Sequence, residues 1–332
     1  MNTVHHISAR REAGMNCLVT GATGFVGRAV VEALRAAGDT AVPVVRGKGE
    51  RSKTDVLSVA VADDFADIVQ CWPASAVYDC VIHLAARVHV TQESSSDPLQ
   101  AFRATNVAGT LRVAQAAAQV GVRRFVYVSS IKAVDAIDHG APLSEADTPR
   151  PVDPYGISKL EAEQALFELG QRTGMAIVVV RPPLVYGPGV RANFHALMQA
   201  VARGLPLPLG CADAPRSMIG LNNLVSAILA CARHPAAAGK VYHVCDGEDV
   251  SVAELVRLLA RAFGRSPRLV PVPAAVLRLA ARATSKQDAM NRLFEPLRVN
   301  GSRIVDELDW RPPQRLWAGL QQTVDWYRTE GT

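Results

Sequence analysis

Features that mark several other protein classes are scarce or missing in this sequence. Its six cysteines form no CxxC pair, and no histidine lies at metal-ligand spacing. In a chain of 332 residues, which can bury a large core without crosslinks, this predicts reduced thiols and no metal site. Arg181 divides MAIVVV from PPLVYG, so no apolar run approaches the 18 residues of a membrane-spanning helix. We therefore expect a soluble, cytoplasmic protein that does not insert into a membrane.

The charge distribution argues against a nucleic-acid-binding tail. The chain carries 36 basic and 31 acidic residues, for a net charge of +5, with no block of five or more like charges. The basic excess fits mild attraction for anionic ligands and, more simply, a solvated basic surface. No nucleic-acid partner is expected, because no recognition motif accompanies the charge. Residues 1–14 are polar and contain no apolar h-region, so we expect neither a secretory signal nor an anchor there. A disordered tail is expected, and a start codon placed too early is the alternative.

Short apolar runs alternate with helical patterns over the first half of the chain. NCLVTG is followed by GRAVVEALRAAG, and RFVYVSS by YGISKLEAEQALFELGQRTG. Such alternation predicts parallel strands joined by right-handed helical crossovers. From Pro182 onward the pattern loosens, with prolines and glycines in RPPLVYGPG and RGLPLPLG. The sequence therefore predicts an α/β protein. Its Rossmann-type doubly wound parallel sheet spans residues 15–181, with later segments returning to it, and a smaller C-terminal α/β lobe spans residues 182–330.

Three glycines spaced three residues apart follow the first predicted strand. In CLVTGATGFVG they are Gly21, Gly24 and Gly27, and a helical pattern begins near Phe25. A strand that ends at Thr20 and a tight turn would place backbone N–H groups and the positive end of a helix against a diphosphate. Glycine suits such a turn because the backbone must bend sharply and approach the ligand closely. The position of the motif in an alternating α/β chain favours this interpretation over a plain glycine turn.

A tyrosine, a lysine and a serine form the second candidate site. Tyr155 and Lys159 are four residues apart in DPYGISKLEAEQ, so they share one face of a helix. A nearby ammonium favours the phenolate, so we expect Lys159 to lower the pKa of Tyr155 toward working pH. Ser130 follows the apolar strand RFVYVS, and the carboxyl ends of parallel strands are where open sheets bind ligands. The alternatives are an exposed helix face and a helix-capping serine.

These motifs together resemble the extended short-chain dehydrogenase/reductase family, which includes nucleotide-sugar epimerases, dehydratases and reductases. TGATGFVG looks like its cofactor fingerprint, HLAA at residues 83–86 like its fourth-strand signature, and NVAGT at residues 106–110 like its next helix start. RPPLVYGPG resembles the segment that leads into the sugar-nucleotide lobe, and LRVNGSRIVDELDWRP the C-terminal signature. The resemblance runs from about Met15 to Tyr327. It implies a NAD(P)-dependent enzyme with the catalytic residues Ser130, Tyr155 and Lys159.

The resemblance also implies which residues bind the ligands. The cofactor would contact Gly21, Thr23, Gly24, Phe25, Val26, Gly27, Arg46, Leu84, Ala85, Ala86, Asn106, Val128, Tyr155, Lys159, Pro182 and Pro183. A UDP-sugar substrate would contact Ser130, Tyr155, Asn193, Phe194, Arg216 and, with poor spacing, Arg292. A surface arginine and a helix-start asparagine remain alternatives for Arg216 and Asn193. The family often has an asparagine where this chain has Leu184, so one polar substrate contact is missing. A homodimer packed through the helices of NVAGT and YGISK is expected.

The end of the second predicted strand bears on the choice of cofactor. NAD-using epimerases of the family have an acidic residue there that holds the adenosine ribose, whereas this chain has Val45 followed by Arg46. A carboxylate would repel a 2′-phosphate, but an arginine can bind it in a bidentate fashion. The sequence therefore favours NADP(H), with NAD(H) possible. The alternative is that Arg46 stacks on adenine or points to water.

The two residues that follow Ser130 limit which reactions of the family are expected. Family dehydratases have Asp and Glu after the catalytic hydroxyl, but this chain has Ile131 and Lys132, which cannot act as that acid and base. A 4-reductase and a 4-epimerase remain. The resemblance is strongest to bacterial polysaccharide-cluster enzymes, as in lipopolysaccharide O-antigen synthesis, that reduce UDP-4-keto-6-deoxy-N-acetylglucosamine to UDP-N-acetylquinovosamine or its C4 epimer. A UDP-glucose or UDP-N-acetylglucosamine 4-epimerase with tightly bound NAD is the alternative. A non-catalytic NADP-binding sensor or scaffold is the alternative of another class.

Overall fold

A computed structural model describes residues 14–46, 59–62, 64–73, 77–88, 97–282 and 293–330. The expected N-terminal tail therefore lies outside the described residues, except for Gly14. A seven-stranded sheet with the order β3-β2-β1-β4-β5-β6-β9 forms the centre of the fold, and every neighbouring pair is parallel. Its strands are β1 (Asn16–Thr20), β2 (Thr40–Arg46), β3 (Val59–Val61), β4 (Cys80–His83), β5 (Arg124–Val128), β6 (Ala176–Arg181) and β9 (Lys240–His243). This arrangement confirms the predicted Rossmann-type fold.

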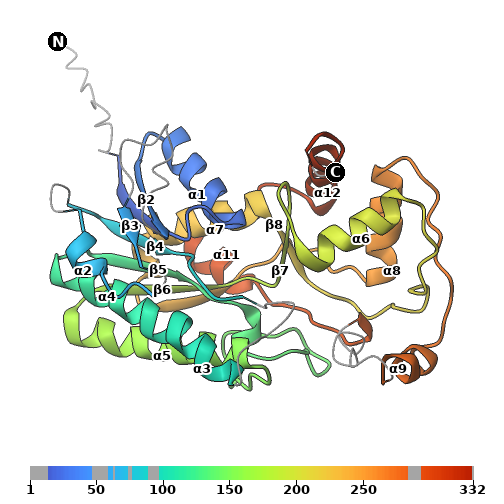
Figure 1. The fold of residues 1–332 in the computed structure, drawn as a ribbon, viewed down its shortest axis with the longest axis horizontal. Helices are drawn as coiled ribbons and strands as arrows, with labels where there is room; N and C mark the ends of the chain where they lie inside the picture. The colour runs from blue at the N-terminus through green and yellow to red at the C-terminus, as the bar shows by residue number, and fades with distance from the viewer. Residues whose placement is uncertain are drawn as a thin grey trace, which may run out of the picture.

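Helices cover both faces of the sheet (Figure 1). Alternate residues of β1 explain why, since Cys17 and Val19 join the apolar cluster on one face and Leu18 joins the cluster on the other. The first face is covered by α1 (Phe25–Ala36), α7 (Leu221–Arg233) and α11 (Ser302–Leu308). The second is covered by α2 (Ile68–Cys71), α4 (Thr110–Gln119) and α5 (Pro154–Thr173). Both faces of the sheet are therefore buried, as the continuous apolar runs predict.

A smaller group of elements lies beyond the carboxyl ends of the strands (Figure 1). It contains the parallel pair β7 (Leu184–Tyr186) and β8 (Met218–Gly220), with the helices α6 (Ala192–Ala202), α8 (Val252–Ala262), α9 (Ala274–Arg282) and α12 (Leu316–Thr329). A third apolar cluster joins α6, α8 and α12. The chain returns from this lobe to the sheet through α7 and β9. The predicted boundary at residue 181 therefore divides the chain only in sequence, because residues beyond it complete the large sheet.

Short helical turns complete the described chain. Helix α3 (Pro98–Arg103) continues through a π-helical turn, η1 (Ala104–Gly109), into α4. The 3-10 turns η2 (Ile131–Ala133) and η3 (Pro235–Ala237) follow β5 and α7. None of the helices in the described ranges is long and apolar enough to cross a membrane. All six cysteines lie in these ranges, and each is a free thiol.

Candidate active site

The glycine turn after β1 is shaped by close backbone contacts. Gly21 has a φ of +67°, and a Cβ at this position would lie 2.7 Å from the backbone nitrogen of Ala85. A Cβ at Gly27 would lie 2.1 Å from the carbonyl oxygen of Gly21, which accepts a hydrogen bond from the backbone N–H of Gly24 at 2.9 Å. The turn therefore needs glycine for its conformation at the first position and for helix-on-strand packing at the third.

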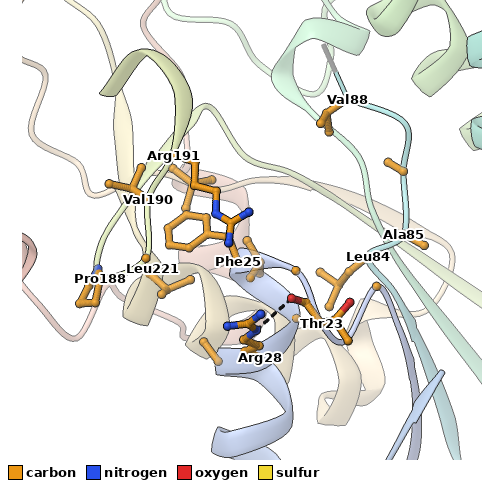
Figure 2. A pocket seen from close by; sticks show the side chains of 18 of the residues that line it. Thr23, Phe25, Arg28, Leu84, Ala85, Val88, Pro188, Val190, Arg191 and Leu221 are labelled. Carbon is orange, nitrogen blue, oxygen red and sulfur yellow. Dashed lines mark hydrogen bonds between the residues drawn. The ribbon is translucent and has the colours of Figure 1, made fainter. Parts of the chain in front are cut away.

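A cavity of about 1270 Å³ opens beside this turn (Figure 2). Helix α1 begins there with Gly24 as its N-cap, and it has no side-chain cap and no acidic residue in its first turn. The free N–H groups of that turn therefore face the cavity, as a diphosphate requires. Nine of the predicted cofactor residues line the cavity: Gly21, Thr23, Gly24, Phe25, Val26, Gly27, Leu84, Ala85 and Ala86. The size, the glycine cradle and the open helix end fit a dinucleotide.

The segment after β4 is fixed by a buried histidine. His83 has no exposed surface, and its two ring nitrogens lie 2.8 Å from the Thr20 hydroxyl and 3.0 Å from the Thr110 hydroxyl. Burial lowers the pKa of His83 to about 3, and the nearby charge of Lys159 adds to this effect. The ring is therefore neutral and structural. It ties β4 to β1 and α4 and so sets the position of Leu84, Ala85 and Ala86 at the cavity wall.

Asn106 lies in the π-helical turn and is fully buried. Its amide oxygen accepts from the backbone N–H of Arg87 at 2.8 Å, and its amide nitrogen donates to the Arg87 carbonyl oxygen at 3.1 Å and to the Ser158 hydroxyl at 3.0 Å. The side chain therefore joins the segment after β4 to α5. A direct cofactor contact by Asn106 remains a prediction, whereas its positioning of the cavity wall follows from these bonds.

Ser130, Tyr155 and Lys159 come together at the carboxyl end of β5. A hydrogen bond joins the side chains of Tyr155 and Ser130. The Lys159 ammonium donates to the carbonyl oxygen of Val128 at 2.9 Å and lies 5.8 Å from the centroid of the Tyr155 ring. His83 of β4 pairs with Tyr127 of β5, so Ser130 and residues 84–86 of the cavity wall follow neighbouring strands at the same edge of the sheet, although none of the three residues of this group is itself among those that line the cavity.

The approach of α5 to the end of β5 explains this convergence. Asp153 caps α5 by accepting from the backbone N–H of Gly156 at 2.8 Å. A Cβ at Gly156 would lie 2.3 Å from the carbonyl oxygen of Lys132, so only glycine lets the first turn of the helix touch η2. Tyr155 and Ser130 therefore meet because the residue between the tyrosine and the rest of the helix has no side chain.

The pKa values of Tyr155 and Lys159 differ from what the sequence predicts. Burial raises the pKa of Tyr155 to about 12, and the hydrogen bond from Ser130 offsets only part of that effect. Burial also lowers the pKa of Lys159 to about 7, against the opposing charge of Glu163. The expected lowering of the Tyr155 pKa is therefore wrong for this protein without ligands, because burial of the phenol, with a smaller contribution from the charge of Asp153, raises that pKa.

A buried polar network behind the three residues was missed from the sequence. Glu163 is 2% exposed; it accepts a hydrogen bond from the Ser129 hydroxyl and pairs with Arg181, whose Nε lies 3.0 Å from Oε1. The Nη1 of Arg181 lies 3.4 Å from Nε2 of His243, whose Nδ1 lies 3.1 Å from the Leu143 carbonyl oxygen. Two signals could have revealed it: Glu163 lies four residues after Lys159, and Arg181 ends an apolar strand.

The neighbours of Ser130 are held by other contacts. Ile131 is 2% exposed, and its backbone N–H donates to the carbonyl oxygen of Pro182 at 2.9 Å. The Lys132 ammonium lies 2.6 Å from the Asp153 carboxylate. Pro182 and Pro183 are both buried. The prolines therefore hold η2 against the end of β6, and Lys132 is engaged in an ion pair at the start of α5.

The predicted substrate residues are spread over the smaller lobe. Phe194 is 3% exposed and stacks on Tyr186 with the ring centroids 5.9 Å apart, whereas Asn193 is exposed. Arg216 donates from Nη1 to the carbonyl oxygen of Glu295 at 2.7 Å. None of these side chains lines the described cavity, so their contacts with a substrate remain predictions. Arg292 and the side chain of Arg46 lie outside the described residues.

The smaller lobe contributes a wall to the cavity that the sequence did not predict. This wall comes from β7 and the loop after it, from α6 and from the end and C-cap of α12, and it is completed by the start of α7, which covers the sheet: Val185, Pro188, Gly189, Val190, Arg191, Ala192, His195, Trp326, Glu330, Leu221 and Asn222. The cavity therefore lies between the glycine turn and the smaller lobe. The motif RPPLVYGPG indicated the start of the smaller lobe, but it did not indicate that this segment would line the cavity beside α1.

Comparison with known proteins gives a consistent assignment. A model described as the NAD dependent epimerase/dehydratase family matches residues 17–245. A Vibrio cholerae protein named UDP-glucose 4-epimerase is 40% identical over 316 residues, which cover 95% of this chain and 96% of the relative. A Pseudomonas aeruginosa protein named GDP-6-deoxy-D-mannose reductase is 31% identical over 323 residues, covering 93% and 96%.

A solved structure agrees with these relatives. MoeE5 in complex with UDP-glucose and NAD superposes with a TM-score of 0.75 at 26% identity, covering 96% of this chain and 100% of that chain. That complex thus combines a nucleotide sugar and a dinucleotide in one protein of this fold. The family match spans well over half of the chain, and the Vibrio relative extends over nearly all of it. The chain therefore belongs to the NAD-dependent epimerase/dehydratase family, the extended short-chain dehydrogenase/reductase family whose motifs it carries.

Proposed function

We propose that this protein is a NAD(P)H-dependent reductase that acts on the C4 ketone of a UDP-4-keto-6-deoxy-N-acetylhexosamine. The contact between the Tyr155 and Ser130 hydroxyls beside the dinucleotide-sized cavity is the observation that carries the proposal. A ketone oxygen placed against these two hydroxyls would receive a proton from one and a hydrogen bond from the other. The product would be UDP-N-acetylquinovosamine or its C4 epimer, for use in surface polysaccharide synthesis.

The ionisation of the two buried groups supports reduction. The pKa of about 12 means that Tyr155 keeps its proton at neutral pH, as a proton donor must. When bound, the reduced nicotinamide would supply a hydride to the C4 carbon. The two hydroxyls would orient the ketone oxygen, and Tyr155 would transfer its proton to that oxygen as negative charge develops there. Lys159, held by the Val128 carbonyl oxygen, would bind the nicotinamide ribose and restore the proton of Tyr155.

The surroundings of Ser130 support this reaction over dehydration. Removal of water from the sugar needs a carboxylic acid and a carboxylate next to the catalytic hydroxyl. Ile131 is apolar and buried, and Lys132 is paired with Asp153. The positions that would carry the acid and the base are therefore occupied by residues that can do neither.

The cofactor is proposed to be NADPH, with NADH as the alternative. Strand β2 ends in Val45 and Arg46 without a carboxylate, and Val44 of the same strand lines the cavity. A 2′-phosphate on the adenosine ribose would therefore meet no acidic residue from the end of β2. Comparison of the Michaelis constants for NADPH and NADH tests this choice. Equal constants would contradict a preference for NADPH.

A UDP-sugar 4-epimerase with retained NAD is the second candidate. The 40% identity with the Vibrio cholerae protein of that name favours it. An epimerase would use the same three residues to remove and return a hydride at C4, so it would consume no cofactor. The two reactions therefore differ in stoichiometry and share their catalytic groups.

One assay separates the candidates. Purified protein is incubated with UDP-4-keto-6-deoxy-N-acetylglucosamine and NADPH while the absorbance at 340 nm is followed. Loss of one NADPH per sugar supports the reductase. No loss, together with conversion of UDP-N-acetylglucosamine to its C4 epimer, supports the epimerase. Neither reaction, with dinucleotide binding intact, would identify a non-catalytic sensor. Sedimentation of the same sample tests the expected homodimer.

A further inference from the structure

The loop between β7 and α6 is anchored on the first residue of α1. A Cβ at Gly189 would lie 3.5 Å from the Phe25 ring, and a Cβ at Gly187 would lie 2.6 Å from the Leu221 side chain. Val190 is 4% exposed and belongs to the apolar cluster of the smaller lobe. Phe25 packs against both that cluster and the cluster on the first face of the sheet. The loop backbone is therefore fixed against the start of α1.

Arg191 follows this anchored loop directly and lines the cavity. In Figure 2 its side chain extends from the loop toward the start of α1, alongside Phe25. Within the described ranges its guanidinium takes part in no hydrogen bond or ion pair. A charged group held at a cavity wall in this way can bind an anionic ligand without first breaking an internal contact.

Arg28 lies in the first turns of α1, on the other side of Phe25 from Arg191 (Figure 2). Its Nε donates to the carbonyl oxygen of Thr23 at 2.9 Å, as the dashed line in Figure 2 marks. This bond fixes the guanidinium next to the glycine turn and leaves its two terminal nitrogens for another acceptor. The two arginines come from different parts of the fold and line one cavity.

The other charges at the cavity place the anion near these arginines. Glu32 and Glu330 line the cavity as well, and His195 lies on the wall of the smaller lobe. Glu32 is one helical turn beyond Arg28 on α1, so it lies farther from the free N–H groups at the helix start. A phosphate group is therefore favoured at the helix start and disfavoured farther along α1.

We propose that Arg191 and Arg28 form a two-sided clamp on the diphosphate of the dinucleotide, with the N–H groups of the first turn of α1 as the third contact. This inference rests on the proposed cofactor function. The clamp makes the smaller lobe part of the cofactor site, because Arg191 reaches the diphosphate only while its loop stays packed on Phe25. Release of the dinucleotide then requires the bond to Arg191 to break or the loop to leave α1.

Binding of ADP-ribose, NAD and NADP to the whole protein tests the clamp. Arg191→Gln and Arg28→Gln keep a polar side chain and remove the charge, and Arg203→Gln at the far, exposed end of α6 is the matched control. We expect each of the first two variants to bind ADP-ribose about 10-fold to 100-fold more weakly. The control should bind like the wild type, and all three should melt within a few degrees of it.

The three ligands distinguish binding of the dinucleotide diphosphate from binding of the 2′-phosphate of NADP. A clamp on the diphosphate weakens binding of NAD, NADP and ADP-ribose by similar factors. A loss confined to NADP would place the arginines on the 2′-phosphate and overturn the proposal, as would wild-type affinity of Arg191→Gln for ADP-ribose. If the wild type itself binds none of the three ligands, the proposed cofactor function fails, which is a different result from failure of the clamp alone.

Discussion

Lys159 donates a hydrogen bond from its buried ammonium nitrogen to the carbonyl oxygen of Val128, 2.9 Å away. The acceptor is the last residue of β5, two positions before Ser130. A side chain of α5 thus holds the end of the strand that leads to Ser130. Lys159 therefore helps to set the distance between α5 and the end of β5, and with it the contact of Tyr155 with Ser130.

Removal of the Tyr155 hydroxyl should separate catalysis from binding. Tyr155→Phe removes the proton donor, so we expect turnover to fall by about 10²-fold to 10⁴-fold. The affinity for NADPH should change little, because the cavity walls stay intact. Steady-state kinetics and fluorescence titration of the cofactor measure the two effects. A wild-type rate in this variant would overturn the role of the tyrosine.

The depressed pKa of Lys159 should appear in the pH dependence of stability. The folded-state pKa is about 7, against an ordinary value of 10.5, so the unfolded chain binds more protons between these two values. Burial of Lys159 therefore destabilises the fold most at and below pH 7, and less as the pH rises toward 10.

A variant without the ammonium isolates this effect. Lys159→Met keeps the length of the side chain and removes the charge. Its free energy of unfolding relative to the wild type should be most favourable near pH 7 and should decline steadily toward pH 10. Urea unfolding of both proteins without ligand at pH 7, 8.5 and 10 measures the difference. A difference that is independent of pH would show that the lysine is not desolvated in the folded protein.

The buried ion pair of Glu163 with Arg181 should be more important for stability than the partly exposed pair of Glu161 with Arg103, which joins α5 to α3. Glu163→Gln leaves a buried guanidinium without its counter-charge, so we expect a loss of about 3 to 5 kcal/mol. Glu161→Gln removes the partner of Arg103, whose side chain is 39% exposed, and should cost less than about 1 kcal/mol. Chemical denaturation compares the two variants, and equal losses would contradict the argument.

The third glycine of the turn should not tolerate a methyl group. Gly27→Ala places a Cβ 2.1 Å from the Gly21 carbonyl oxygen, so α1 must move away from β1. We expect weaker binding of NAD and NADP, by about 10-fold or more, together with a lower melting temperature. Gly109→Ala is the control, since its nearest neighbours would lie at 3.4 Å. Unchanged cofactor affinity in Gly27→Ala would refute the packing role.

The features that the sequence predicted correctly depend on short-range patterns. The alternation of strands and helices defines the sheet, and the spacing of Gly21, Gly24 and Gly27 defines the turn. Tyr155 and Lys159 lie one helical turn apart, so their common face follows from helix geometry alone. Family membership follows from the same segments and is confirmed by the family match.

The features that could not be predicted depend on packing between distant segments. The pKa of Tyr155 depends mainly on how deeply its side chain is buried, and a local sequence pattern does not show this. The bond between Asn106 and the Arg87 backbone requires the π-helical turn, and nothing in NVAGT indicates an extra residue in that turn. The proposed role of Arg191 depends on the contact of Gly189, in the loop after β7, with Phe25 at the start of α1, which lies 164 positions earlier in the sequence.

Strand β9 has a consequence for any attempt to divide this protein. Residues 240–243 form the outermost strand beside β6, and α7, which precedes them in sequence, covers one face of the sheet. A fragment that stops at residue 181 would expose the backbone edge of β6 and the apolar residues beneath α7 to water. We expect such a fragment to aggregate, and two co-expressed halves cut at this point to be recovered only as a joined pair.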